Sequence, residues 1–99
     1  MKTAKSEYQE KVISKLRKLR VDNNISQAQL SGILSISPGQ IGNIESYKYS
    51  HKYTLKQIKK ICDYFNYPVD YIFLDENEEI KDKDEAINML ILKIIEYDK

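Results

Sequence analysis

The sequence predicts an all-α fold, and two observations support this prediction. The first is a capping pattern in which Ser or Thr is followed three residues later by Gln. The hydroxyl can then accept from a backbone N–H of the first helical turn, while the Gln side chain returns to the N–H of the cap residue. The second is helical spacing of apolar residues after each cap. The two signals coincide at Ser6/Gln9, Ser26/Gln29, Ser37/Gln40 and Thr54/Gln57.

The caps and the apolar spacing place the predicted helices along the chain. Residues 1–5 are expected to be frayed, and the first helix is expected from Ser6 to about Asp22. Two short helices occupy Ser26–Glu45, with Pro38 at the first position of the second, where its missing N–H costs nothing. Because almost no linker separates these two helices, they must cross steeply, which is the shape of a helix-turn-helix. Further helices are expected over residues 54–66, 68–73 and 84–97.

The formal net charge of +1 conceals an asymmetry along the chain. Residues 1–60 contain 12 Lys/Arg and 4 Asp/Glu, a net charge of +8, whereas residues 61–99 contain 4 Lys and 11 Asp/Glu, a net charge of −7. Such a division is typical of a surface that faces a polyanion joined to a part that is kept away from it. Solvated helix faces that differ by chance are the alternative interpretation.

Length and composition exclude several classes of protein. Ninety-nine residues predict one domain with a modest core. No apolar run approaches the roughly 20 residues that span a bilayer, and the N-terminal residues lack the apolar segment of a signal peptide, so a cytoplasmic protein without membrane association is expected. With one cysteine (Cys62) and one histidine (His51), the chain offers no four-ligand zinc site, and neither a metal nor another cofactor is expected. No set of nucleophile and base stands out, so an enzyme is not expected.

Four short motifs occur in the order and spacing of a known family. They are Leu16-Arg17-x-Leu19-Arg20, Ser26-Gln27-x-x-Leu30, Ile41-x-x-Ile44-Glu45 and Pro68-Val69-Asp70-Tyr71-Ile72-Phe73. Through them, residues 16–73 resemble the Xre/Cro–CI type of helix-turn-helix repressor domain. The resemblance implies a compact five-helix bundle as a DNA-binding domain over residues 1–74. It also implies a structural ion pair between Arg20 and Glu45 that ties the first helix to the third.

The resemblance further implies that the recognition helix, about residues 38–46, enters the major groove of double-stranded DNA. A helix in that groove presents its N-terminal residues to base edges, while the preceding helix and nearby loops contact phosphates. Gln40 and Asn43 are the expected base readers, because Gln and Asn can bond adenine bidentately. Gln40 can instead be committed to its cap, and Gln27 is either a phosphate ligand or a solvated side chain. The full candidate set is Ser26, Gln27, Ser37, Pro38, Gly39, Gln40, Asn43, Tyr47, Lys48 and Lys52.

Three features depart from the usual pattern of the family. The loop at residues 46–53 is slightly longer and lacks Gly and Pro, but it carries lysines and tyrosines that could bond phosphates. Tyr53, the last of these tyrosines, is expected to pack against the bundle. Gly32 and Gly42 each weaken helix propensity by up to about 1 kcal/mol, and Gly42 could permit either close packing or close approach to DNA. Pro38 and Gly39 occupy positions where relatives often carry base-reading side chains.

The C-terminal part is divided by its composition into an acidic linker, residues 75–83, and an apolar helix, residues 84–97. The apolar stripe of this helix is wider than a single packing partner requires. We therefore predict a homodimerisation surface, formed by Ile87, Leu90, Ile91, Ile94 and Ile95. Folding of the helix back onto its own bundle is the alternative.

Together, these features predict a sequence-specific DNA-binding transcriptional regulator, repressor-like and homodimeric. One alternative is an antitoxin, in which the same DNA-binding module engages a basic toxin through its acidic C-terminal part. The other alternative is a protein-interaction adaptor on the same bundle. An adaptor would show no salt-dependent DNA binding, whereas a protein that contacts several phosphates loses affinity steeply with salt.

Overall fold

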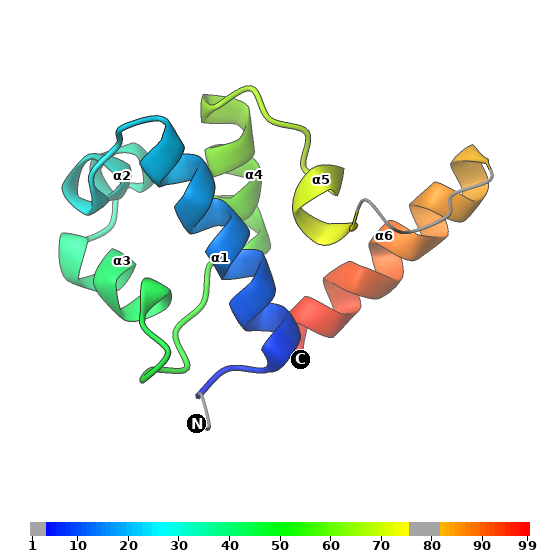
Figure 1. Cartoon of the computed structure of the whole chain (residues 1–99), viewed down its shortest axis with the longest axis horizontal. Helices are drawn as coiled ribbons and strands as arrows, with labels where there is room; N and C mark the ends of the chain where they lie inside the picture. The colour runs from blue at the N-terminus through cyan, green and yellow to red at the C-terminus, as the bar shows by residue number, and fades with distance from the viewer. Residues whose placement is uncertain (1–3, 76–81) are drawn as a thin grey trace.

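Every regular element of the computed structural model is an α-helix within the residues that it describes, 4–75 and 82–99. This confirms the predicted all-α class. All four predicted capping boxes are formed, with both of their hydrogen bonds present. Figure 1 shows the helices in order: α1 (Glu7–Asp22), α2 (Gln27–Leu34), α3 (Pro38–Glu45), α4 (Leu55–Tyr64), α5 (Asp70–Phe73) and α6 (Lys83–Asp98).

Three helix ends are shaped by residues in the left-handed region of φ. Asn24 follows α1 with φ of 57°, Ser35 follows α2 with φ of 57°, and Asn66 follows α4 with φ of 54°. Asparagine tolerates this conformation better than most residues with a side chain. The predicted helix over 54–66 therefore ends earlier, at Tyr64, since Asn66 does not have the backbone conformation of a right-handed helix.

The core surrounds α1, which lies at the centre of the bundle (Figure 1). α1 contacts α3, α5 and α6, while α2 packs against α3 and α4. One apolar side of each helix faces inward, as the spacing of the apolar residues requires. The buried apolar side chains are Val12, Ile13, Leu16, Leu30, Leu34, Ile41, Ile44, Tyr53, Ile58, Ile61, Cys62, Ile72, Phe73 and Tyr97.

The C-terminal helix α6 folds back onto the bundle against α1 and α5. Leu90 and Ile94 are half-buried against the core, and Tyr97 is fully buried beside Phe73, with ring centroids 6.0 Å apart. The remaining members of the predicted dimerisation surface point outward and are exposed by 46–52%: Ile87, Ile91 and Ile95. The structure therefore divides the apolar stripe of α6 into an inner and an outer face.

The expectation that residues 1–5 are frayed is wrong for residues 4 and 5. The backbone N–H of Ala4 donates to the carbonyl of Tyr47 at 3.0 Å, and the side chain of Lys5 has no exposed surface. The order comes from contacts with a distant loop, which no local pattern could reveal. Residues 1–3 lie outside the described residues, as does most of the predicted acidic linker, residues 76–81. Asp75, at the start of that linker, pairs with Lys11 and Lys15 of α1.

Candidate nucleic-acid interface

The helix-turn-helix is formed by α2, the turn at residues 35–37, and α3. The turn is closed by the N–H of Ile36, which donates to the carbonyl of Ser31 at 3.0 Å. Ser37 then accepts from the backbone N–H of Gln40 and caps α3. Buried apolar residues on facing sides of the two helices hold them together: Leu30, Leu34, Ile41 and Ile44. This packing fixes the direction in which the N-terminus of α3 points.

The first turn of α3 is exposed to solvent from Ser37 to Gln40. The Gln40 side chain closes the capping box, because its Oε1 accepts from the N–H of Ser37 at 3.0 Å. Its amide oxygen is thus bonded in the cap, which corresponds to the capping interpretation of Gln40 rather than to base reading through both amide atoms. Asn43, one turn further along the helix, is half-exposed.

The N-terminus of α2 lies beside the end of α3. Ser26 caps α2 through its own box with Gln29 and is exposed. Gln27 is also exposed, but its Nε2 donates to Oε1 of Glu45 at 3.0 Å. The side chain of Gln27 therefore joins α2 to α3. Both interpretations of this residue, a phosphate ligand and a solvated surface side chain, are compatible with its exposure.

A buried ion pair connects α1 to the C-terminal end of α3. Arg20 donates from Nε to Oε2 of Glu45 at 2.8 Å and from Nη2 to Oε1 at 2.7 Å, and its Nη1 donates to the carbonyl of Ile25 at 2.7 Å. The hydrogen bonds to Glu45 raise the pKa of Arg20 above its ordinary value, although burial opposes this shift. Two parallel bonds between planar groups fix orientation as well as distance. The pair therefore sets the angle of α3 against α1.

The loop at residues 46–53 continues from α3 and carries the predicted basic and aromatic side chains. Tyr47 and Lys48 are exposed, in agreement with a role in contacting an external partner. Lys52 is half-buried, because its Nζ donates to the carbonyl of Tyr97 at 3.0 Å and lies 5.2 Å from the centre of the Tyr97 ring. Tyr53 is buried as expected, and burial raises its pKa well above the ordinary value.

None of the three glycines is required by packing within the described residues. A Cβ at Gly42 would meet Oε1 of Gln27 at 3.7 Å, and one at Gly39 would meet Oγ of Ser37 at 3.9 Å, which are ordinary contacts. A Cβ at Gly32 would meet nothing within 4 Å. Close packing inside the described part of the protein therefore does not explain Gly42.

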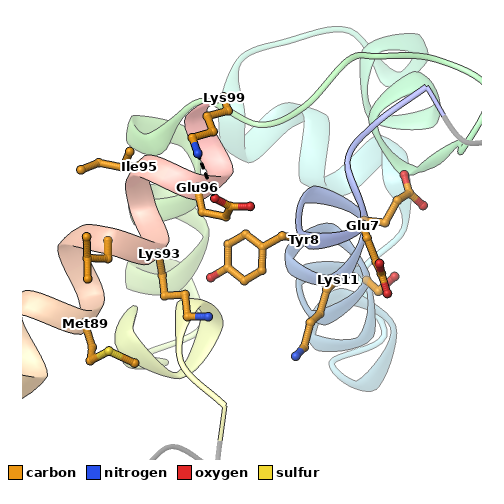
Figure 2. A pocket seen from close by; sticks show the side chains of 11 residues that line it. Glu7, Tyr8, Lys11, Met89, Lys93, Ile95, Glu96 and Lys99 are labelled. Carbon is orange, nitrogen blue, oxygen red and sulfur yellow. Dashed lines mark ion pairs between the residues drawn. The ribbon is translucent and has the colours of Figure 1, made fainter.

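A groove of about 940 Å³ lies away from the helix-turn-helix, between α1 and α6. In Figure 2, Met89 and Lys93 lie on the α6 side of the groove, and Tyr8 of α1 projects from the other side. The hydroxyl of Tyr8 donates to the carbonyl of Phe73 at 2.6 Å, and Nζ of Lys93 lies 5.4 Å from the centre of its ring. The groove also carries charges of both signs, among them Glu7, Lys11 and Lys93.

The described residues form neither a metal-binding cluster nor a membrane-spanning helix. Among residues 4–75 and 82–99, no cluster of three or more His, Cys, Asp or Glu side chains is placed to hold a metal ion. In the same ranges, no helix combines the length and the apolar character needed to cross a membrane.

Sequence reasoning missed two side chains of this region, Lys5 and Tyr97. Lys5 donates to the carbonyl of Tyr49 at 2.7 Å, and the hydroxyl of Tyr97 donates to the carbonyl of Tyr53 at 2.7 Å. Tyr97 lies three and seven residues beyond Ile94 and Leu90, so helical spacing could have assigned it to the inner face of α6. No sequence signal identifies Lys5.

The comparisons with known proteins give one match. No curated protein and no solved structure shows a significant match to the chain. A family model described as a helix-turn-helix domain matches residues 13–78, which is about two thirds of the chain and runs from within α1 to beyond α5. Domains of this type are typically DNA-binding and not enzymatic. The chain belongs to the helix-turn-helix domain family, of the Xre/Cro–CI type.

Proposed function

We propose that the protein is a sequence-specific transcriptional regulator, repressor-like, that binds double-stranded DNA through α3. The observation that carries this proposal is the exposed N-terminal turn of α3, held in a fixed direction by the buried Arg20–Glu45 pair. A rigid helix with exposed N-terminal residues is what major-groove recognition requires. The basic charge of residues 1–60 supports binding to a polyanion.

Within this proposal, the side chains take different roles. Asn43 reads a base edge, because it is half-exposed on the same helix and its amide can bond adenine bidentately. Gln40 contributes through its amide nitrogen, since its oxygen holds the cap. Ser26 and Gln27 at the first turn of α2, together with Tyr47 and Lys48, contact phosphates and fix the register. Lys52 is a less direct phosphate ligand, because its ammonium is bonded to α6.

The deciding experiment selects bound sites from random double-stranded DNA with the purified full-length protein. The affinity for the selected site and for a scrambled site is then measured over a range of salt concentrations. We expect the selected site to bind more tightly and the logarithm of the affinity to fall linearly with the logarithm of the salt concentration. Absence of salt-dependent binding, or equal affinity for both sites, would favour the protein-interaction adaptor instead.

Two substitutions separate base reading from phosphate contact. Asn43→Ala is expected to weaken binding to the selected site and to relax discrimination at one base pair, whereas Lys48→Ala is expected to weaken binding to all sequences about equally. Lys59→Ala, at an exposed position on α4, is the matched control for Lys48→Ala. Equal effects of Asn43→Ala on the selected and scrambled sites would refute its assignment as a base reader.

We propose that the active form is a homodimer joined through the outer face of α6. Ile87, Ile91 and Ile95 support this because they form one exposed apolar stripe at spacing i, i+4, i+8. Two copies related by a two-fold axis would present their α3 helices to half-sites about 34–36 Å apart. Co-purification of a basic protein with the chain would instead indicate the antitoxin alternative, in which a toxin takes the place of the second copy.

The dimer is tested by a point substitution, because removal of α6 would also expose the buried site of Tyr97. Sedimentation velocity at tens of micromolar is expected to show a dimer for the unmodified protein and a monomer for Ile91→Lys. Val21→Lys is the matched control, since Val21 on α1 is exposed by 46%, close to the 49% of Ile91. A monomeric unmodified protein, or a dimer that tolerates Ile91→Lys, would contradict this interface.

A further inference from the structure

The loop at residues 46–53, which follows the recognition helix, is held by both ends of the described chain. From the N-terminal side, Ala4 donates its backbone N–H to the carbonyl of Tyr47 at 3.0 Å, and Lys5 donates from Nζ to the carbonyls of Ser46 and Tyr49. From the C-terminal side, the hydroxyl of Tyr97 donates to the carbonyl of Tyr53 at 2.7 Å. Four backbone carbonyls of one loop are therefore fixed by residues outside it.

The lysine of this arrangement is unusual in its burial. The side chain of Lys5 has no exposed surface, although lysine is among the residues least often buried. Burial lowers its pKa below the ordinary value, and Glu10, whose Oε1 lies 3.7 Å from Nζ, acts in the opposite direction. A buried ammonium requires hydrogen-bond acceptors, and the carbonyls of the loop supply two of them.

Tyr97, at the end of α6, is also buried. Its ring is fully buried against Phe73, and its own carbonyl accepts from Nε2 of Gln9 at 2.8 Å and from Nζ of Lys52 at 3.0 Å. A cation near the C-terminus of a helix interacts favourably with the helix dipole. Tyr97 thus joins α6, α1 and both the side chain and the backbone of the loop.

We propose that Lys5 and Tyr97 are positioning residues for DNA binding, which clamp the loop so that Tyr47 and Lys48 meet phosphates beside the recognition helix. This inference rests on the proposed DNA-binding function. The clamp residues do not contact DNA themselves. A free loop would have to be ordered at each binding event, and ordering the backbone opposes association. A clamped loop has already lost this conformational entropy when the protein folds, so DNA binding does not require it to be lost again.

The test uses two full-length variants that each remove one part of the clamp. Tyr97→Phe removes only the hydroxyl that bonds Tyr53, and Lys5→Met removes the ammonium while keeping a similar chain length. The matched controls are Tyr64→Phe and Lys59→Met, which make the same chemical changes at exposed positions of α4. Thermal unfolding defines a temperature at which all variants are fully folded. Tyr97→Phe keeps the test decisive if Lys5→Met does not fold.

DNA affinity is measured at that temperature over a series of salt concentrations. Each clamp variant is expected to bind on the order of fivefold more weakly than the unmodified protein, with a shallower dependence on salt because a phosphate contact is lost. The controls are expected to match the unmodified protein, apart from the small nonspecific effect of one charge in Lys59→Met. Folded clamp variants with unchanged affinity and unchanged salt dependence would overturn the proposal.

A second measurement separates this inference from the proposed function. NMR order parameters of the backbone amides in the DNA-free proteins report on the order of the loop. Residues 47–52 are expected to have lower order parameters in the clamp variants than in the controls, while those of α2 and α3 stay unchanged. If the unmodified protein binds no DNA, the proposed function fails, and lower order parameters in the clamp variants still show a clamp whose role is then different. Unchanged order parameters of the loop in both variants would refute the clamp itself.

Discussion

Removal of one partner from the Arg20–Glu45 pair is expected to destabilise the protein strongly. The side chain of Arg20 is exposed by 9% and that of Glu45 by 4%, so each charge relies on the other rather than on water. Substitution of Glu45 by Gln leaves the Arg20 guanidinium buried with the carbonyl of Ile25 as its remaining described acceptor outside the pair. Breaking a buried pair in this way typically costs about 3–5 kcal/mol.

Substitution of the other partner, Arg20→Leu, is expected to lower the free energy of unfolding by an amount at the lower end of that range. The Glu45 carboxylate keeps the hydrogen bond from Gln27, and Arg17 lies within reach, with its Nε 3.7 Å from Oε1. Combining Arg20→Leu with Glu45→Gln removes both buried charges, and this avoids the uncompensated charge that each single variant leaves. The double variant should therefore be more stable than the sum of the single effects implies, with a coupling energy of about 2–3 kcal/mol.

Urea denaturation followed by circular dichroism at 222 nm measures these free energies. A domain of this size has a total stability of roughly 5–15 kcal/mol, so the single variants should remain largely folded at low temperature. Their unfolding midpoint should shift to a lower urea concentration, while the dependence of the free energy of unfolding on urea concentration stays unchanged. Lys18→Met is the control, because its ion pair with Asp22 is exposed and should contribute nothing measurable. Additive single effects, or single effects below about 1 kcal/mol, would refute the reasoning.

Three further predictions concern stability and reactivity. Ser35→Gly should stabilise the protein by about 0.5–1 kcal/mol in urea denaturation, since glycine accommodates the left-handed φ of 57° without strain; a loss of stability would contradict this. Gly32→Ala should stabilise by up to about 1 kcal/mol and leave DNA affinity unchanged, because the added Cβ meets nothing within 4 Å. Burial raises the pKa of the Cys62 thiol from 9.0 to about 11. The native thiol should therefore react slowly with a thiol reagent at pH 8. The unfolded thiol loses its proton at a lower pH than the native thiol, so the free energy of unfolding should fall between about pH 9 and 11. In Cys62→Ala, the free energy of unfolding should fall less steeply with pH near about pH 9–10.

The local parts of the fold could be predicted because their causes lie within one helical turn. Each capping box joins residues three positions apart, such as Ser37 and Gln40, and all four are formed as the sequence indicates. The inward faces of α1 to α4 follow from apolar spacing for the same reason. The family resemblance added the Arg20–Glu45 pair, which joins residues 25 positions apart and which no local rule predicts.

The contacts around the loop at residues 46–53 could not be predicted because they join the most distant parts of the chain. Lys5 and Ser46 are 41 residues apart, and Gln9 and Tyr97 are 88 residues apart. Nothing in the composition of residues 1–5 distinguishes a buried lysine from a solvated one. The assignment of Lys52 to DNA rested on its charge and on its place in the loop beside the recognition helix, whereas its bond to the end of α6 depends on how that helix docks.

The two faces of α6 make this helix a link between the proposed dimer and the proposed clamp. Leu90, Ile94 and Tyr97 form its inner stripe, and the amphipathic tyrosine belongs there because its hydroxyl finds the carbonyl of Tyr53. A second copy bound to the outer stripe, which contains Ile91, would hold the same helix in place. Binding free energies at two linked sites are reciprocal, so dimerisation and DNA binding should each strengthen the other. Ile91→Lys acts only on the outer stripe and Tyr97→Phe only on the inner one. A DNA affinity in the double variant that equals the product of the single effects would show that the two faces act independently.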